Sequence, residues 1–276
     1  MRCGVRWKAA ALAAAHVGLA AAAALAAAGC YATLERRARD AAASGLDPAP
    51  LVAELEAQFE EIRVTKRIFG VTLLEGRRRF RGEGVVQYRS EPRRLRADIF
   101  GPHDTPVLRV TLVGEELTVV LPREGEVLTG TLGDPRFAEQ AGERALASPE
   151  ILGAILGAYE VAPLVEGAGL VAAAGDDGDR VLYVVRREAV HAFTLRAVAT
   201  GEGEAAPGAR LVEYRQGREG RLVYRVRFED FAPVDGRWSP RHVVLRDYVK
   251  ERSLVIDVTR EHEDVPADPT ATPVGG

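Results

Sequence analysis

Cys30 is the residue of this chain whose chemistry the sequence indicates most clearly. It follows an alanine-rich apolar run, which itself begins after three basic residues, Arg2, Arg6 and Lys8. No acidic residue precedes Glu35. A basic head, an apolar body and a small-residue exit are typical of a secretory signal. The sequence therefore predicts an exported chain, with the thiol of Cys30 at or next to the cleavage site.

Residues 25–30 resemble the lipobox at the end of a bacterial lipoprotein signal, since they read LAAAGC. The resemblance implies that residues 1–29 are removed as a signal peptide. It also implies that diacylglycerol and an N-acyl chain are attached to Cys30. A strong lipobox has leucine three places before the cysteine, where this chain has Ala27, and the leucine here is Leu25.

Two other interpretations of the N-terminus stay open. A plain signal peptide could be cleaved after residues 26–28, which would leave Cys30 as a free thiol. The apolar run over residues 9–28 could also remain as a membrane anchor, because it is about long enough to span a bilayer. Cysteine usage favours lipid attachment, since Cys3 lies inside the signal and Cys30 is then alone in the mature chain.

Composition limits the kinds of partner. The chain has 276 residues and a net charge of -3, and removal of the three basic residues of the signal leaves about -6. A nucleic-acid surface needs a clustered basic excess, so no nucleic-acid partner is expected. After the signal the basic residues are almost all arginine, with Lys66 and Lys250 as the exceptions. We interpret this preference as the codon bias of a GC-rich genome.

Four segments are expected along the chain. A signal peptide over residues 1–29 is followed by a polar, alanine-rich tether over residues 30–46. A folded domain covers residues 47–263, and a proline-containing disordered tail covers residues 264–276. No second apolar segment is long enough to cross a membrane, so the folded domain is expected to be soluble and tethered.

The folded domain is expected to open with an amphipathic helix over residues 48–63. Asp47 followed by Pro48 is a typical helix start. Apolar residues then recur at helical spacing: Leu51, Leu55, Phe59 and Ile62. We expect this stripe to pack against the core.

Period-two patterning and tight turns predict two sets of strands. The first set covers residues 64–74, 79–89, 93–100, 107–113, 116–121 and 126–131. The second covers residues 169–174, 180–187, 189–199, 209–216, 221–228, 237–248 and 252–262. No alternating βαβ pattern appears, so the predicted class is α+β, with a large curved antiparallel sheet and a few helices against one face.

Two helices are expected between these sets of strands. The first, over residues 135–146, is polar and alanine-rich. The second begins at residues 148–150, where serine and proline form a typical start. Its apolar residues are Ile151, Leu152, Ile155 and Leu156. Two interpretations of this short helix stay open: it is a buried core helix, or it is a lid whose apolar face closes a cavity.

Few residues after the signal could catalyse a reaction or hold a metal. No nucleophile elbow, zinc-protease motif or phosphate loop is present. The histidines fit no metal motif: His103, His191, His242 and His262. The acidic run over residues 175–179 lacks the final glutamate of a calcium loop and is expected to be a hairpin turn. No catalytic residue, no metal and no cofactor beyond the lipid on Cys30 is expected, and a hydrolase is a distant alternative.

The order of these elements resembles the outer-membrane lipoprotein-sorting family, the half-open β-barrels of the carrier LolA and the receptor LolB. A lipidated cysteine, an amphipathic helix, a six-strand meander, a short apolar helix and further strands follow one another. Two stretches also resemble the family in their letters. Residues 94–102 run from a strand into a proline-containing loop, and residues 151–157 form an apolar helix that ends in glycine.

The resemblance implies an apolar cavity between the half-open barrel and the helices on its concave side. Such a cavity receives acyl chains, and each buried methylene contributes about 0.8 kcal/mol. The helix side would be formed by Ile151, Leu152, Ile155 and Leu156. The sheet side would be formed by Leu95, Ile99 and Leu108, with Val85 and Val110 as further candidates.

The loop after Pro102 departs from the receptor. The receptor presents an exposed leucine after the loop proline, and with it hands lipoproteins to the membrane. This chain has His103 there, followed by Asp104. A polar tip does not insert into a bilayer as leucine does, so we expect a relative with the same fold and another cargo or task.

The function expected from these features is that of a lipid-anchored binding protein facing the periplasm. It would hold lipid or lipoprotein acyl chains, and its envelope protein partners stay open. Tyr31, rather than aspartate, follows the cysteine, which favours the outer membrane. The alternative is a structural or interaction lipoprotein of an envelope complex, whose half-barrel is filled by its own side chains. The presence of an apolar cavity would distinguish the binding protein from the structural lipoprotein.

Overall fold

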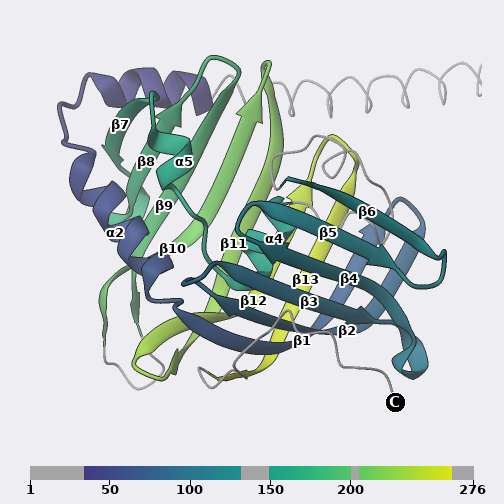
Figure 1. Cartoon of the computed structure of the whole chain (residues 1–276). Helices are drawn as coiled ribbons and strands as arrows, with labels where there is room; N and C mark the ends of the chain where they lie inside the picture. Colours follow the sequence, from purple (N-terminus) through teal and green to yellow (C-terminus); the bar gives the residue numbers. More distant parts are fainter. Residues whose placement is uncertain (1–33, 132–148, 200–204, 263–276) are drawn as a thin grey trace, which may run out of the picture.

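The computed structural model describes residues 34–131, 149–199 and 205–262. Within these ranges, thirteen strands form one antiparallel sheet in the order β6-β5-β4-β3-β2-β1-β13-β12-β11-β10-β9-β8-β7. Each half of the chain is therefore a meander, and the first and last strands join the halves where β1 pairs with β13. Figure 1 shows that the sheet curves strongly, with β6 and β7 as its two edges.

The α+β class and the large curved antiparallel sheet are confirmed. The strands are β1 (Val64–Glu75), β2 (Arg78–Arg89), β3 (Arg94–Phe100), β4 (Pro106–Val113), β5 (Glu116–Leu121), β6 (Glu126–Thr131), β7 (Gly169–Ala174), β8 (Arg180–Val185), β9 (Ala189–Ala199), β10 (Ala205–Arg218), β11 (Arg221–Val234), β12 (Arg237–Asp247) and β13 (Arg252–His262). The helical segments are the N-terminal helix (residues 34–42), α2 (Ala49–Glu60), η1 (Pro102–Asp104), α4 (Pro149–Leu156), α5 (Ala162–Val165) and η3 (Asp176–Gly178).

Every predicted strand is present, and β11 differs most from its predicted end. The pattern predicts an end near residue 228, but the strand continues to Val234. Its ladder with β12 extends as far as the pair Val234 and Arg237. Hydrogen bonding to a neighbouring strand can override the weak strand preference of residues such as Pro233. The partner strand, rather than local composition, sets this boundary.

β8 is buried on both faces, because each face is covered by a different helix. Leu182 and Val184 belong to the concave core, whereas Val181 and Tyr183 point to the convex side. On that side they are covered by three residues of the N-terminal helix: Leu34, Ala38 and Ala41. The segment predicted as a tether over residues 30–46 is therefore, from its helix onward, packed against the domain.

α2 covers the concave face beside the β7 edge (Figure 1), opposite the N-terminal helix. Leu51 and Leu55 are buried in the core, as the predicted stripe requires. Polar groups of α2 also bind the start of β10, where its pairing is irregular. Gln58 Oε1 accepts a hydrogen bond from the Leu211 amide at 3.0 Å, and Glu54 Oε1 accepts one from the Ala209 amide at 2.9 Å. These side chains replace ladder bonds that the irregular strand lacks.

Several predictions fall on residues that the structure does not describe. They are the signal peptide with Cys30, the helix over residues 135–146 and the tail over residues 264–276. Within the described ranges, no helix combines the length and the apolar character that crossing a membrane requires.

Candidate functional site: the two faces of the sheet

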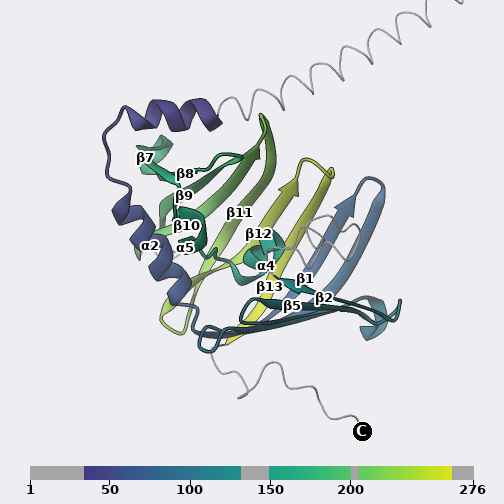
Figure 2. The same ribbon diagram turned by 45° about the horizontal axis from the view of Figure 1, so that its top comes forward.

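The concave face brings together the residues predicted to line a cavity. All four residues named on α4 are buried: Ile151, Leu152, Ile155 and Leu156. The sheet-side residues belong to the same apolar core: Leu95, Ile99, Leu108 and Val110. Figure 2, like Figure 1, shows α4 lying inside the curve of the sheet. The short helix therefore occupies the space in which the family resemblance predicts a ligand.

Val85 does not belong to this set. It pairs with Asp98 and is only half-buried, whereas the next residue, Val86, is fully buried opposite Ala97. Successive residues of a strand point to opposite faces. The assignment of Val85 to the cavity side is therefore wrong, and Val86 takes that place. Two adjacent valines look alike in the sequence, and only the pairing register distinguishes them.

A buried ionic cluster lies beside the end of α4, with Glu261 at its centre. Arg67 Nε donates to Glu261 Oε1 at 2.8 Å, and Arg237 Nη2 donates to the same oxygen at 2.5 Å. Ser239 Oγ donates to Glu261 Oε2 at 2.6 Å. Thr65 lies against the same carboxylate, and all five residues are buried. Two guanidinium ions and two hydroxyl groups thus surround one carboxylate.

The charge of Glu261 is maintained by its partners. Burial alone would raise the pKa of this carboxyl, but the charges of Arg67 and Arg237, with hydrogen bonds from Ser239 and Arg67, outweigh it. Together they lower the pKa of Glu261 to about 2. Burial lowers the pKa of Arg67 from its ordinary value, and Glu261 opposes that shift. Each ion is therefore stable inside the protein only while the others are present.

Arg67 also connects this cluster to α4. Its Nη1 donates a hydrogen bond of 2.9 Å to the carbonyl oxygen of Ile155. The last carbonyls of a helix lack partners within the helix, and a cation at that end is favourable. Gly157 follows with φ 73°, and a Cβ there would lie 2.7 Å from Arg67 Nη1. α4 is therefore joined to the sheet by a polar contact as well as by its apolar side chains.

Space beside this cluster is small. A hollow of about 20 Å³ borders Arg67, Gly157 and Pro240. This volume suits about one water molecule and is far below that of an acyl chain. A much larger hollow lies on the other face of the sheet.

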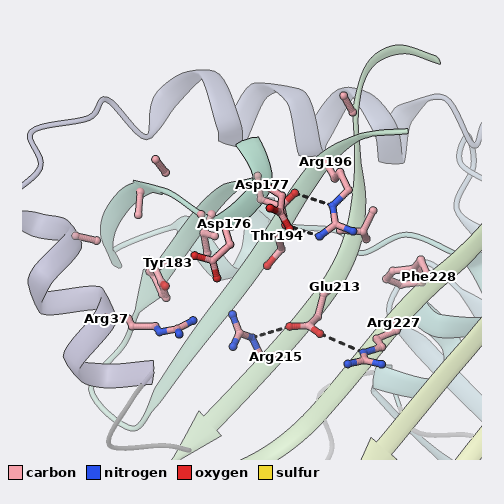
Figure 3. Close-up of a pocket in the computed structure, with 18 of the residues that line it drawn as sticks. Arg37, Asp176, Asp177, Tyr183, Thr194, Arg196, Glu213, Arg215, Arg227 and Phe228 are labelled. Atoms are coloured by element: carbon pink, nitrogen blue, oxygen red, sulfur yellow. Dashed lines mark hydrogen bonds and ion pairs between the residues drawn. The ribbon is translucent and has the colours of Figure 1, made fainter. Parts of the chain in front are cut away.

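The convex face carries a groove of about 1270 Å³ between the N-terminal helix and the strands β7 to β11 (Figure 3). Arg37 and Asp40 of the helix form part of its wall. The floor includes polar and charged residues that alternate with the concave core: Thr194, Glu213, Arg215, Arg225 and Arg227. Charged side chains suit a polar or ionic ligand, whereas a site for acyl chains is mainly apolar.

Glu213 is the centre of the basic part of this groove. Arg225 Nε donates to Glu213 Oε2 at 2.7 Å, and Arg215 Nε lies 3.0 Å from Glu213 Oε1. Arg227 Nε is 3.5 Å from Glu213 Oε2. One carboxylate therefore faces three guanidinium groups, which gives this part of the groove a local positive excess.

The other end of the groove is acidic. Asp176 and Asp177 lie on the turn between β7 and β8, which confirms the predicted hairpin turn. Asp179 is neutralised by Arg196 through two hydrogen bonds of 2.7 and 2.8 Å. In the part of the chain that the structure describes, no group of three histidine, cysteine or acidic residues is placed to hold a metal ion.

Sequence reasoning missed this groove. Arginine content was interpreted as codon bias, although Glu213 and Arg215, and Arg225 and Arg227, are spaced to share a strand face. That spacing was the available signal. The register of β10 with β11, which places Glu213 opposite Arg227 and Arg215 opposite Arg225, is not revealed by local patterns.

The predicted polar loop is present as η1. Pro102 and His103 are both exposed, and His103 adopts a left-handed conformation with φ 61°. The loop connects β3 to β4. It therefore presents a polar tip, as its sequence indicates.

No protein-family model and no curated protein matches the sequence. Three solved structures resemble the chain in shape. A DUF1329 family protein from Desulfovibrio piger is 14% identical with a TM-score of 0.56, and the alignment covers 81% of this chain and 96% of that one. A LolA superfamily protein from Nitrosomonas europaea is 12% identical with a TM-score of 0.53, covering 78% and 94%.

The third is a putative outer membrane lipoprotein-sorting protein domain from Vibrio parahaemolyticus. It is 10% identical with a TM-score of 0.57, and the alignment covers 83% of this chain and 95% of that one. Identities this low establish a common fold and no more. The chain therefore has the LolA/LolB-like fold, a half-open β-barrel, here with α2 and α4 on its concave side.

Proposed function

We propose that this chain is a lipid-anchored envelope protein that binds lipid or lipoprotein acyl chains on the concave face of its half-barrel. The proposal rests on the LolA/LolB-like fold and on α4, an eight-residue helix whose apolar residues fill the curve of the sheet, so that an acyl chain can enter only where α4 gives way. A helix this short is not stable alone in water, so its position depends on contacts with the sheet. An acyl chain can replace those contacts at about 0.8 kcal/mol for each buried methylene.

Binding requires α4 to move, and Arg67 determines how difficult that movement is. Displacing α4 breaks the 2.9 Å hydrogen bond between Arg67 and the Ile155 carbonyl oxygen. A hydrogen bond to a charged group contributes about 1.5–3 kcal/mol. About four buried methylenes would offset this bond alone, and further methylenes would have to replace the apolar contacts of α4, so a long acyl chain is the ligand expected to displace the helix.

The anchor supports a location at the membrane surface. The N-terminal helix packs against β8 and β9 from Leu34 onward. Cys30 is four residues earlier, which is at most about 14 Å of extended chain. A lipid on Cys30 would therefore hold the half-barrel close to the bilayer, and we propose the periplasmic side of the outer membrane. The lipoprotein-sorting fold of the Vibrio domain supports this proposal.

Native mass spectrometry of the chain purified from membranes tests the cavity. We expect co-purified lipid, together with uptake of a long-chain fluorescent fatty acid. Arg67→Met should speed uptake because it frees the end of α4, whereas Arg109→Gln on the convex face should leave it unchanged. Absence of bound lipid and of uptake, both in the parent protein and in Arg67→Met, would reject the proposal.

The anchor has a separate test with a matched control. Cys30→Ser should abolish incorporation of labelled palmitate and release the protein from membranes. Cys3→Ser should leave both unchanged, because Cys3 lies in the segment proposed to be removed. Labelling that persists in Cys30→Ser would reject lipid attachment at this residue.

A second candidate function is favoured by the same contact of Arg67. If α4 remains fixed, the half-barrel is filled by its own side chains, and the chain acts as an interaction lipoprotein of an envelope complex. This candidate predicts no fatty-acid uptake even in Arg67→Met. We propose no enzymatic activity for either candidate.

A further inference from the structure

Three arginines stand directly opposite one another on the convex face. Arg215 of β10 pairs with Arg225 of β11, and Arg225 pairs in turn with Arg246 of β12. We call these three residues the arginine ladder. Like charges directly opposite each other destabilise a sheet. The side chain of Arg215 is only 21% exposed and that of Arg225 32%, so water screens them incompletely.

Acidic residues of the protein neutralise the positive charge of these arginines only in part. Glu213 forms ion pairs with Arg215, Arg225 and Arg227. Among the described residues, neither Arg37 nor Arg246 takes part in an ion pair. Glu213 therefore faces an excess of guanidinium groups. An unbalanced group of cations of this kind attracts an anion from solution.

Arg37 extends the cationic region across the groove. Figure 3 shows Arg37, Arg215 and Arg227 along one side of the groove, with Glu213 between the last two. Both Arg37 and Arg215 act on the hydroxyl of Tyr183, where they partly oppose the rise in pKa that burial causes. The N-terminal helix and the sheet thus contribute positive charge to the same space.

Over its whole lining the groove has six carboxylates and five arginines, so the positive excess is confined to the arginines around Glu213. Figure 3 shows Asp176 and Asp177 toward Thr194 and Arg196 rather than beside Glu213, while Asp179 is paired with Arg196. Asp40 and Glu229 also border the groove. The arginines around Glu213 therefore form a local basic region in a groove whose other charged residues are mostly acidic.

We propose that the arginine ladder, together with Arg37 and Arg227, is a binding site for a phosphate-bearing anion: the headgroup of an anionic lipid or a soluble phosphate compound. Glu213 lies beside the Nε atoms of Arg215 and Arg227, and it takes both Nε and Nη2 of Arg225. The terminal N–H groups of Arg215 and Arg227 are not used by Glu213 and can form the fork that binds phosphate. The groove has room for a small molecule; Arg37, Arg215, Arg225 and Arg227 line it, and Arg246 adjoins it on β12 opposite Arg225.

This site is independent of the proposed acyl site, because the two lie on opposite faces of the sheet. Titration calorimetry on the full chain in neutral detergent tests it with four probes. They are inorganic phosphate, glycerol 3-phosphate, dihexanoyl phosphatidylglycerol and dihexanoyl phosphatidylcholine. We expect phosphatidylglycerol to bind more tightly than phosphatidylcholine, and salt to weaken its binding.

Variants locate the site. Arg225→Gln and Arg246→Gln should each lower the association constant for phosphatidylglycerol about fivefold, since each basic residue near an anionic lipid contributes by about that factor. Arg246 is exposed, so its replacement should leave folding unchanged. If Arg225→Gln unfolds, Arg246→Gln alone tests whether the arginine ladder binds the lipid. Arg109→Gln is the matched control, because Arg109 lies on the convex face in the other half of the sheet.

Each outcome is decisive. Binding of phosphatidylglycerol without the two soluble phosphates would assign the site to a lipid headgroup. Binding of the soluble phosphates that is weakened by Arg246→Gln would assign it to a soluble phosphate compound. Equal binding of both lipids, unaffected by the ladder variants, would reject this site while leaving the acyl site intact. No binding of any probe, or equal weakening by Arg109→Gln, would also reject it.

Discussion

The two faces of the same three strands differ in what fills them. On the concave side, β10 to β12 carry a row of apolar residues: Tyr214, Val226 and Leu245. On the convex side, the neighbouring positions carry the arginine ladder: Arg215, Arg225 and Arg246. Since successive residues alternate between faces, one set of strands forms both a closed core and an open charged groove. Fold resemblance directs attention to the concave face, whereas the larger open space lies on the convex face.

Charge clusters on the two faces differ in burial. The carboxylate of Glu261 is fully buried among its partners, whereas Glu213 keeps some contact with solvent. Removing one member of a buried cluster leaves uncompensated ions without water, and removing one at a solvated site does not. The concave face should therefore dominate stability, and the convex face should be freer to exchange partners with a ligand.

The largest expected effect is that of Glu261→Ala. It leaves Arg67 and Arg237 buried without their counter-ion, so the free energy of unfolding should fall by about 3–5 kcal/mol. Urea unfolding followed by circular dichroism measures this change. Glu213→Ala is the matched variant on the convex face, and its effect should be less than half as large. Equal effects would show that the two clusters do not differ in desolvation.

Ile155→Ala tests the packing of α4. Its side chain is buried in the core, and truncation of such a residue lowers the free energy of unfolding by about 2–5 kcal/mol. Val85→Ala removes apolar volume from the half-exposed convex face and should change stability by less than about 1 kcal/mol. Urea unfolding of the two variants in parallel gives the comparison. A small effect for Ile155→Ala would mean that α4 contributes little to the folded state.

Stability should also depend on pH through the concave face. Burial, with smaller contributions from Arg186 and Arg218, lowers the pKa of His191 from 6.5 to about 4. Between these values the unfolded chain binds a proton that the folded chain does not, so stability falls as pH decreases from 6.5 to 4. The shift corresponds to about 3 kcal/mol. Thermal unfolding across this range should show the decrease, and His191→Gln should remove it; an unchanged slope in that variant would contradict this origin.

Glu261 acts in a lower pH range. Its pKa is lowered from 4.5 to about 2 in the folded state, so its stabilising effect is complete above 4.5 and decreases as pH falls toward 2. Acid unfolding of Glu261→Gln should lack this lower step while it keeps the step of His191. If the unfolding step at low pH persists in Glu261→Gln, that step arises from other carboxyl groups.

The strands could be predicted because their residues follow local patterns. The site could not be predicted, since it depends on which strands pair and in which register. Alternating residues and tight turns predicted all thirteen strands, and helical spacing predicted α2 and α4. Val85 was assigned to the wrong face because two adjacent valines give no local preference. The cluster of Arg67 and Glu261 joins residues 194 positions apart, so no local pattern indicates it. The arginine ladder likewise exists only once β10, β11 and β12 are in register.

The smallest expected effect is that of Arg109→Gln, which shows how far an exposed ion pair on the convex face supports the fold. Arg109 pairs with Asp98 at 2.5 Å, and its side chain is 39% exposed. Asp98 keeps a second partner, Arg96, at 2.7 Å. The free energy of unfolding should therefore fall by less than about 1 kcal/mol, as measured by urea unfolding. A loss near that of Glu261→Ala would mean that convex ion pairs also hold the sheet together, and the arginine ladder would then have to be regarded as part of the same structural network.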